Sequence, residues 1–153
     1  MKVCTKTILL LALVSVMAAC ASLQKFDGAK NRDWSLVEVR TGQQNITIDR
    51  SRQAEDRFGE IFTLHFDEER ISGVGAPNRY FAPYTLADRQ GMSIGVIAGT
   101  MMASLFEPEN LKEHEYFAWL QNVERWNIAG EKLELHSKKE DGSQAVLIFI
   151  PAE

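Results

Sequence analysis

Cysteine is scarce in this chain, and both cysteines lie near the N-terminus. Among 153 residues only Cys4 and Cys20 carry a thiol. The chain beyond residue 20 can therefore form no internal disulfide and supplies no thiolate nucleophile or zinc-binding thiolate. We expect residues 33–153 to fold as one domain, which must depend on hydrophobic packing for its stability.

A surplus of basic side chains is also missing. The formal net charge is −4, and because Lys2 and Lys6 are the only charged residues before Cys20, the rest of the chain carries 15 basic and 21 acidic residues. Binding of nucleic-acid phosphates needs a surface rich in lysine and arginine. We therefore expect no nucleic-acid partner.

The residues that most often assemble a catalytic or metal site are few. The only histidines are His65, His114 and His136, and their spacing matches no metal-binding motif. No serine lies in a Gly-x-Ser-x-Gly context, and no Lys-Ser or Lys-Thr follows the glycines of residues 73–75, so neither a hydrolase elbow nor a phosphate loop is present. The sequence predicts a protein that is not an enzyme and needs no metal or cofactor.

The N-terminus has the features of a bacterial lipoprotein leader. Two lysines precede an apolar run over residues 8–17, which is too short to span a bilayer, and Ala18-Ala19-Cys20 closes the segment. Small residues before a cysteine suit a signal peptidase, and the Cys20 thiol can then carry diacylglycerol. Met17 stands where leucine is usual, so an ordinary signal peptide with a chance cysteine is the alternative interpretation.

This pattern divides the chain into a signal peptide at residues 1–19, a lipidated tether at 20–32 and a domain at 33–153. Residues 21–32 mix small and polar side chains without periodicity. We expect the mature protein to be anchored in the bacterial cell envelope by its N-terminal lipid. Ala21, in place of an aspartate, favours the outer membrane, with the domain facing the periplasm.

Alternating apolar residues predict a mainly antiparallel β fold. Strands are expected at residues 34–40, 46–49, 61–66, 70–74, 80–86, 92–98, 126–128, 132–136 and 145–150. Short turn sequences, such as residues 88–91 and 140–143, separate these strands and favour hairpins.

One segment instead has helical periodicity. Residues 110–123 lack glycine and proline, and an apolar stripe contains Tyr116, Phe117, Leu120 and Val123. Asn110 and Glu113 resemble a capping box at its start. We expect one helix packed against the sheet.

Short motifs follow one another in a fixed order from residue 33 to 150. They are Trp34-Ser35-Leu36, Leu64-His65-Phe66-Asp67, Ile71-Ser72-Gly73, Asn78-Arg79-Tyr80-Phe81-Ala82-Pro83-Tyr84, Met92-Ser93-Ile94, Thr100-Met101-Met102-Ala103, Tyr116-Phe117-Ala118-Trp119-Leu120, Trp126-Asn127-Ile128 and Leu133-Glu134-Leu135. This order resembles the META domain family, which includes the HslJ-type heat-inducible lipoproteins. The cysteine pair of many relatives is absent here, because Ala76-Pro77-Asn78 replaces their Gly-Cys-Asn.

The resemblance implies an antiparallel curled sheet or incomplete barrel with one packed helix, in the mainly β (α+β) class. It implies a role associated with envelope stress, drug tolerance or secretion, without an established reaction. Two functions are compatible with the sequence: an accessory factor that binds another envelope protein, or a carrier or sensor that holds a small apolar ligand in the mouth of the incomplete barrel.

A possible recognition surface lies in the irregular segments around residues 73–83 and 100–106, because loops commonly carry recognition. Its candidate residues are Asn78, Arg79, Tyr80, Thr100 and Met102. The alternative is structural: asparagine after proline is a common turn former, and Tyr80 and Tyr84 alternate as core residues do.

The leader makes a direct prediction about Cys20. Replacement of the lipid-bearing thiol, Cys20→Ser, is expected to release the protein into the soluble periplasmic fraction, because the lipid supplies the anchoring energy. Fractionation and immunoblotting would measure this. Retention of the variant in membranes after a carbonate wash would contradict the prediction.

Overall fold

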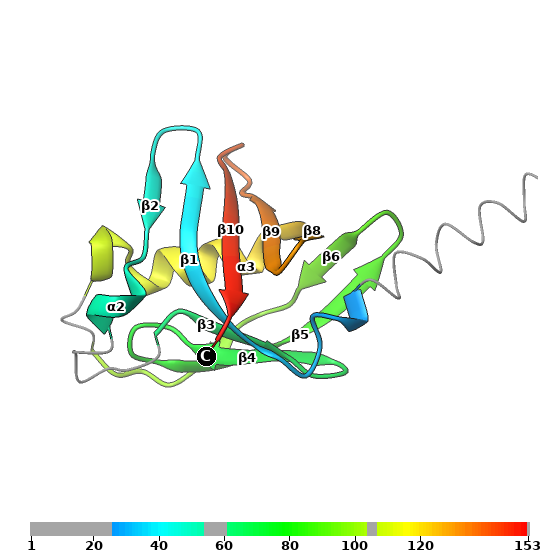
Figure 1. Ribbon diagram of the computed structural model, residues 1–153, viewed down its shortest axis with the longest axis horizontal. Helices are drawn as coiled ribbons and strands as arrows, with labels where there is room; N and C mark the ends of the chain where they lie inside the picture. Colours follow the sequence, from blue (N-terminus) through cyan, green and yellow to red (C-terminus); the bar gives the residue numbers. More distant parts are fainter. Residues whose placement is uncertain (1–25, 54–60, 104–106, 153) are drawn as a thin grey trace, which may run out of the picture.

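The computed structural model describes residues 26–53, 61–103 and 107–152. Its strands are β1 (Asp33–Thr41), β2 (Asn45–Thr47), β3 (Thr63–Phe66), β4 (Arg70–Val74), β5 (Arg79–Ala87), β6 (Gly91–Ile94), β7 (Ala98–Gly99), β8 (Val123–Ala129), β9 (Lys132–Lys138) and β10 (Gln144–Pro151). Its helical segments are α2 (Arg50–Gln53), the 3-10 turn η1 (Pro108–Asn110) and α3 (Glu113–Gln121). The mainly β class with one longer helix is confirmed (Figure 1).

The sheet closes on itself. Strands pair antiparallel in the order β10-β9-β8-β6-β5-β4-β3-β1, and β1 also pairs with β10 from Trp34 opposite Pro151 to Thr41 opposite Ala145. The eight strands therefore form a closed barrel, and the incomplete barrel that we expected is wrong on this point. The predicted periodicity identified the strands but not the pairing between the two ends of the chain.

The hairpin turns lie where the turn sequences predict them. Arg89 and Gln90 have positive φ between β5 and β6, and Gly130 and Gly142 have positive φ in the two C-terminal hairpins. The expected strand at 92–98 is interrupted, because β6 ends at Ile94 and β7 resumes at Ala98. Both pieces pair with the same edge of β5.

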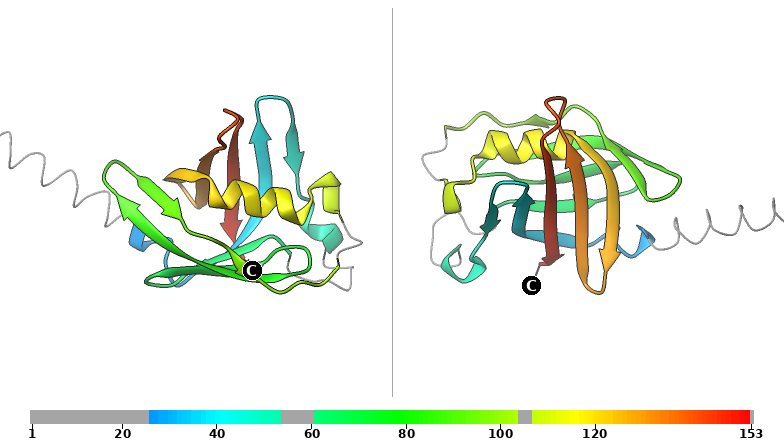
Figure 2. Two further views of the ribbon diagram at one scale, coloured as in Figure 1. Left: turned by 180° about the vertical axis from the view of Figure 1, so that it is seen from behind. Right: turned by 90° about the horizontal axis from the view of Figure 1, so that it is seen from above.

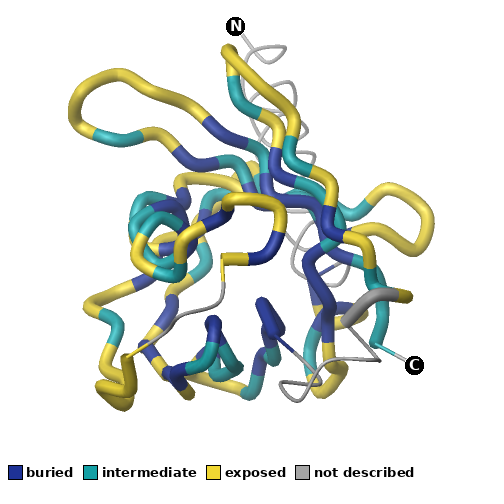
Figure 3. The backbone as a smooth tube through the Cα atoms, turned by 90° about the vertical axis from the view of Figure 1, so that its left-hand side faces the viewer, coloured by how far each residue is buried: buried dark blue, intermediate teal, exposed yellow. Residues whose placement is uncertain are grey.

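Side chains fill the barrel. Alternate residues of the strands point inward, and the largest fully buried side chains include Trp34, Phe66, Trp126 and Phe149 from strands and Tyr116 from α3. Figure 3 shows that exposed residues dominate the hairpin tips, while buried ones line the strands. The interior is therefore packed core rather than a ligand chamber.

The packed core also includes residues before β1. Phe26 and Ala29 are fully buried, and the Phe26 ring lies 4.9 Å from the Trp126 ring and 5.1 Å from the Phe66 ring, centroid to centroid. Trp34 Nε1 donates a hydrogen bond to the Ala29 carbonyl at 3.0 Å. We expected a tether as far as residue 32, and for residues 26–32 this is wrong because they belong to the domain.

Helix α3 covers the part of the wall where strand pairing is sparse. The ladder between β6 and β8 has one pair, Gly91 opposite Arg125, and α3 runs alongside β6 and β9 (Figure 2). Tyr116, Trp119 and Leu120 are buried on its inner face. The expected stripe omitted Trp119 and included Val123, which instead begins β8.

In the parts of the chain that the structure describes, no helix has the length and apolar character needed to cross a bilayer. The predicted signal peptide and Cys20 lie outside these residues.

The packing of α3 on the barrel predicts that a smaller side chain at Leu120 strongly destabilises the domain. The Leu120 side chain is fully buried in the core, so Leu120→Ala should lower the free energy of unfolding by about 2–5 kcal/mol through lost burial and the cavity left behind. Urea unfolding of the full chain in non-ionic detergent would measure this. A loss well below about 1 kcal/mol would show that α3 does not pack tightly on the barrel.

Candidate functional site

Asn78 occupies the turn between β4 and β5 and is 5% exposed. Its Oδ1 accepts hydrogen bonds from Thr100 Oγ1 at 2.8 Å and the Met102 amide at 2.7 Å. Its Nδ2 donates to Glu113 Oε2 at 2.6 Å and to the Met102 carbonyl at 3.0 Å. Both donors and both acceptor positions of the amide group are therefore used.

Glu113, the first residue of α3, completes this arrangement. Its Oε1 accepts hydrogen bonds from the backbone amides of Ala76 at 2.6 Å and Asn78 at 2.7 Å. A Cβ atom on Gly75 would lie 2.5 Å from this oxygen, so the close approach requires glycine. The Asn78–Glu113 junction ties the β4–β5 turn, the segment after β7 and the start of α3 together.

Tyr80 points into the core beside the same junction. Its hydroxyl donates to the Thr63 carbonyl at 2.7 Å and lies 3.0 Å from the Tyr116 hydroxyl. Burial raises the pKa of both tyrosines well above the ordinary value, so both phenols stay neutral. The pair links β5 and α3 to β3 and is inaccessible to a partner.

The candidate recognition residues therefore separate into two groups. Asn78 and Tyr80 are buried structural residues, so their assignment to an exposed surface is corrected, and the structural alternative describes them. Thr100 is exposed, but its hydroxyl is engaged with Asn78. Arg79 and Met102 are exposed on the surface of the domain.

Large apolar side chains are exposed around Arg79 and Met102. Phe81 on β5 is 52% exposed, Val96 before β7 is 79%, and Met101 and Met102 after β7 are 98% and 54%. Phe81 lies opposite Ala98 in the β5–β7 ladder. We name this set the β5–β7 surface; its members are Arg79, Phe81, Val96, Ala98, Met101 and Met102.

One edge of the β5–β7 surface has no strand partner in the described parts of the chain, because β7 pairs with β5 alone. Aromatic, methionine and arginine side chains are the types enriched at protein interfaces. An open strand edge beside them can receive an extended segment of another protein. The surface combines both features.

The histidines do not come together. His65 Nδ1 lies 2.8 Å from Asp33 Oδ1 on the barrel exterior, His136 Nε2 lies 3.7 Å from Glu134 Oε2, and His114 is exposed on α3. Among the described residues, no three His, Cys, Asp or Glu side chains gather as metal ligands would. No serine or threonine hydroxyl in these residues has a hydrogen bond to a histidine.

A cleft of about 510 Å³ lies at one end of the barrel. The β1–β2 hairpin, the β9–β10 hairpin and α3 surround it, and Val39, Ile46, Leu111 and Trp119 contribute apolar walls. Lys139 Nζ lies 3.8 Å from the centroid of the Trp119 ring, at the edge of the cleft. This cleft is separate from the filled barrel interior.

The sequence did not reveal the structural roles of two residues. Its pattern placed Glu113 in a capping box and assigned no role to Arg50. The Arg50 guanidinium donates hydrogen bonds to the carbonyls of Leu36, Ile61 and Phe62, with Nη1 to Ile61 O at 2.6 Å. Nothing in the spacing of these residues indicated such long-range contacts.

The fold and site define a small closed antiparallel β-barrel domain in which buried Asn78, Tyr80 and Tyr116 are bonded within the structure and whose outer surface is partly apolar. The chain belongs to the META domain family, whose model matches residues 21–152. Among curated proteins no match is found.

Two solved structures have a similar fold. A protein from Burkholderia xenovorans, solved by NMR, has a TM-score of 0.62 and 20% identity, with 88% of each chain covered. A DUF4847 family protein from Bacteroides vulgatus, solved by crystallography, has a TM-score of 0.56 and 11% identity, with 82% of this chain and 95% of that chain covered. At these identities the similarity shows the fold alone.

The two groups of candidate residues predict opposite results for neighbouring substitutions. Asn78→Ala leaves the Met102 amide and a Glu113 oxygen without their partner, so it should lower the unfolding free energy by about 1.5–3 kcal/mol. Arg79→Ala should change it by less than about 0.5 kcal/mol. Chemical unfolding of both variants tests this, and equal effects would contradict the assignment.

Proposed function

We propose that this chain is a non-catalytic, lipid-anchored protein of the bacterial envelope that acts by binding another envelope protein through the β5–β7 surface. The proposal places it with accessory or stress-related factors, at the outer membrane and facing the periplasm. The leader sequence supports the location. The observation that carries the binding function is the exposure of four large apolar side chains on β5 or within three residues of β7: Phe81, Val96, Met101 and Met102.

The apolar character of the β5–β7 surface favours binding of a protein partner. Burial of the exposed parts of these four side chains by a partner would be favourable at about 25 cal/mol per Å² of apolar area. Arg79 adds a guanidinium that can engage a carboxylate at the rim. The β7 edge adds backbone groups that can pair with an extended segment.

The absence of catalysis is part of the proposal. In the described residues the buried amide of Asn78 and the half-buried carboxylate of Glu113 are bonded to each other and to the backbone. Activation of a nucleophile needs a base within hydrogen-bond reach of it. The positions of His65, His114 and His136 offer no such pair.

The cleft beside Trp119 favours a second candidate function. Its mainly apolar walls and volume of about 510 Å³ suit a small apolar ligand. In this form the carrier hypothesis moves from the mouth of an incomplete barrel, because the barrel is closed and filled, to the cleft between α3 and the hairpins. A carrier would copurify with a small organic molecule, whereas the binding factor would copurify with a protein.

Site-specific crosslinking tests the first function. A photoreactive amino acid at Met101 is expected to crosslink one defined protein in the native envelope, because Met101 is almost fully exposed within the β5–β7 surface. The same group at Glu131, in the exposed β8–β9 turn, serves as the positional control. Mass spectrometry identifies the products.

A second change in the same chain gives the specificity control. Arg79→Ala combined with Phe81→Ser should remove the crosslink at Met101 while the thermal unfolding temperature stays nearly unchanged, since both side chains are exposed. Identical crosslinks from Met101 and Glu131, or a crosslink that survives the double change, would contradict binding through this surface.

A further inference from the structure

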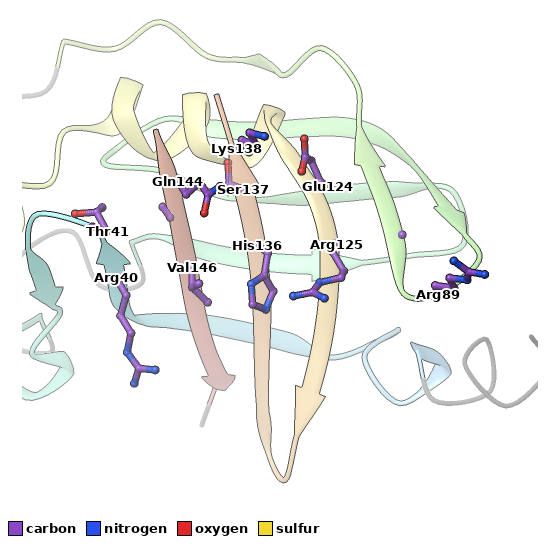
Figure 4. A pocket seen from close by; sticks show the side chains of 13 residues that line it. Arg40, Thr41, Arg89, Glu124, Arg125, His136, Ser137, Lys138, Gln144 and Val146 are labelled. Atoms are coloured by element: carbon purple, nitrogen blue, oxygen red, sulfur yellow. The ribbon is translucent and has the colours of Figure 1, made fainter. Parts of the chain in front are cut away.

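A row of outward-facing side chains crosses four strands on another part of the barrel. Arg40 on β1 lies opposite Val146 on β10, Val146 opposite His136 on β9, and His136 opposite Arg125 on β8. Neighbouring strands lie about 4.8 Å apart, so the row spans about 14 Å. These residues line a groove of about 660 Å³ (Figure 4).

The groove has a local excess of positive charge on an acidic protein. Arg40, Arg89, Arg125 and Lys138 line it, whereas Glu124 is the one carboxylate in its lining. The formal net charge of the whole chain is −4. The positive charge of the groove therefore does not reflect the overall composition of the chain. The fold brings these basic side chains together.

Two nearby carboxylates outside the lining, Glu38 and Glu134, offset part of this positive charge. Glu38 accepts hydrogen bonds from Arg40 Nε at 2.7 Å and Nη2 at 2.9 Å. Glu134 Oε2 accepts a hydrogen bond from Asn127 Nδ2 at 3.0 Å and lies 3.7 Å from His136 Nε2. Among the described residues, the Arg125 guanidinium makes no hydrogen bond or ion pair.

Arg125 and His136 are placed to act together. Figure 4 shows the Arg125 side chain extending toward the His136 imidazole, with Val146 on the other side of the ring. A guanidinium and an imidazole side by side supply several N–H donors to one anion, and Val146 gives the groove an apolar floor. We propose that this groove binds a phosphate group, with Arg125 and His136 as its ligands and Arg40 at the flank.

The charges around His136 agree with an anion there. Burial, and then the charge of Arg125, hold the pKa of His136 below its ordinary value, while Glu134 on the same strand opposes this. From β1 the groups that face this row are Arg40 and its partner Glu38, and from β10 the facing residue is apolar. A bound phosphate would offset the charge of Arg125 and favour the protonated imidazole, so binding should raise the pKa of His136 and tighten as pH falls.

NMR titration of the full chain in a non-ionic detergent tests the site. Inorganic phosphate, added at constant ionic strength against chloride, is expected to shift the His136 ring signals in a saturable way and to raise the pKa of His136. Arg125→Gln should weaken phosphate binding by about tenfold, because hydrogen bonds to charged groups are strong. Arg70→Gln, at the exposed β3–β4 hairpin, is the charge-matched control and should bind as the unmodified chain does.

A parallel titration with short-chain phosphatidylglycerol separates the two sources of a phosphate group. Tighter binding of the lipid than of inorganic phosphate would assign the groove to a lipid headgroup, and the reverse to a soluble phosphate compound; either supports the site. No saturable shift at His136 with either probe would overturn the proposal. Equal weakening by Arg70→Gln and Arg125→Gln would also overturn it, since the effect would then be one of overall charge.

Discussion

The pairing of β1 with β10 is the constraint on which the rest of the structure depends. These strands come from opposite ends of the domain, and their antiparallel ladder converts a curled sheet into a closed barrel. Closure removes the two longest free edges and encloses the aromatic core. Because the inside is occupied by side chains, the surfaces that we propose for binding lie on the outside of the barrel.

The ladder is accommodated by an irregularity in β1. Between Leu36 and Glu38 the register with β10 shifts, and on its other edge β1 changes partner from β3 to β2. At this bulge Arg50 donates to the Leu36 carbonyl and ties it to the carbonyls of Ile61 and Phe62. The guanidinium thus gives the Leu36 and Ile61 carbonyls a donor and shares the Phe62 carbonyl with the Leu36 amide.

Local patterns predicted most of the fold. Alternation of apolar residues located the strands, except that the one expected at 92–98 is divided into β6 and β7. The turn residues Gly130 and Gly142 adopt the positive φ that their hairpins need. The helix was expected from residue 110 but begins at Glu113, because Asn110 has positive φ and belongs to η1. Between β6 and β7, Gly95 approaches Pro83 so closely that a Cβ atom would lie 2.9 Å from the proline Cγ.

Long-range contacts were beyond the reach of periodicity. Closure through β10, the burial of Phe26 under Trp126 and the bonds from Glu113 to the β4–β5 turn each join residues far apart in sequence. A pattern in one strand carries no information about such partners. For the same reason the sequence placed Asn78 and Arg79 together in one candidate surface, and residue type alone could not tell that Asn78 is buried while Arg79 is exposed.

Hydrogen exchange across the β1–β10 ladder tests the central claim most directly. The closed barrel predicts that the ladder amides of β1 and β10 exchange only through global unfolding, with the same opening free energy as the ladder amides of β9. Exchange measured by NMR at increasing denaturant would give both values. Exchange of the β1 and β10 amides through a low-energy local opening, while β9 stays protected, would contradict closure and return the barrel to the open form that the sequence first indicated.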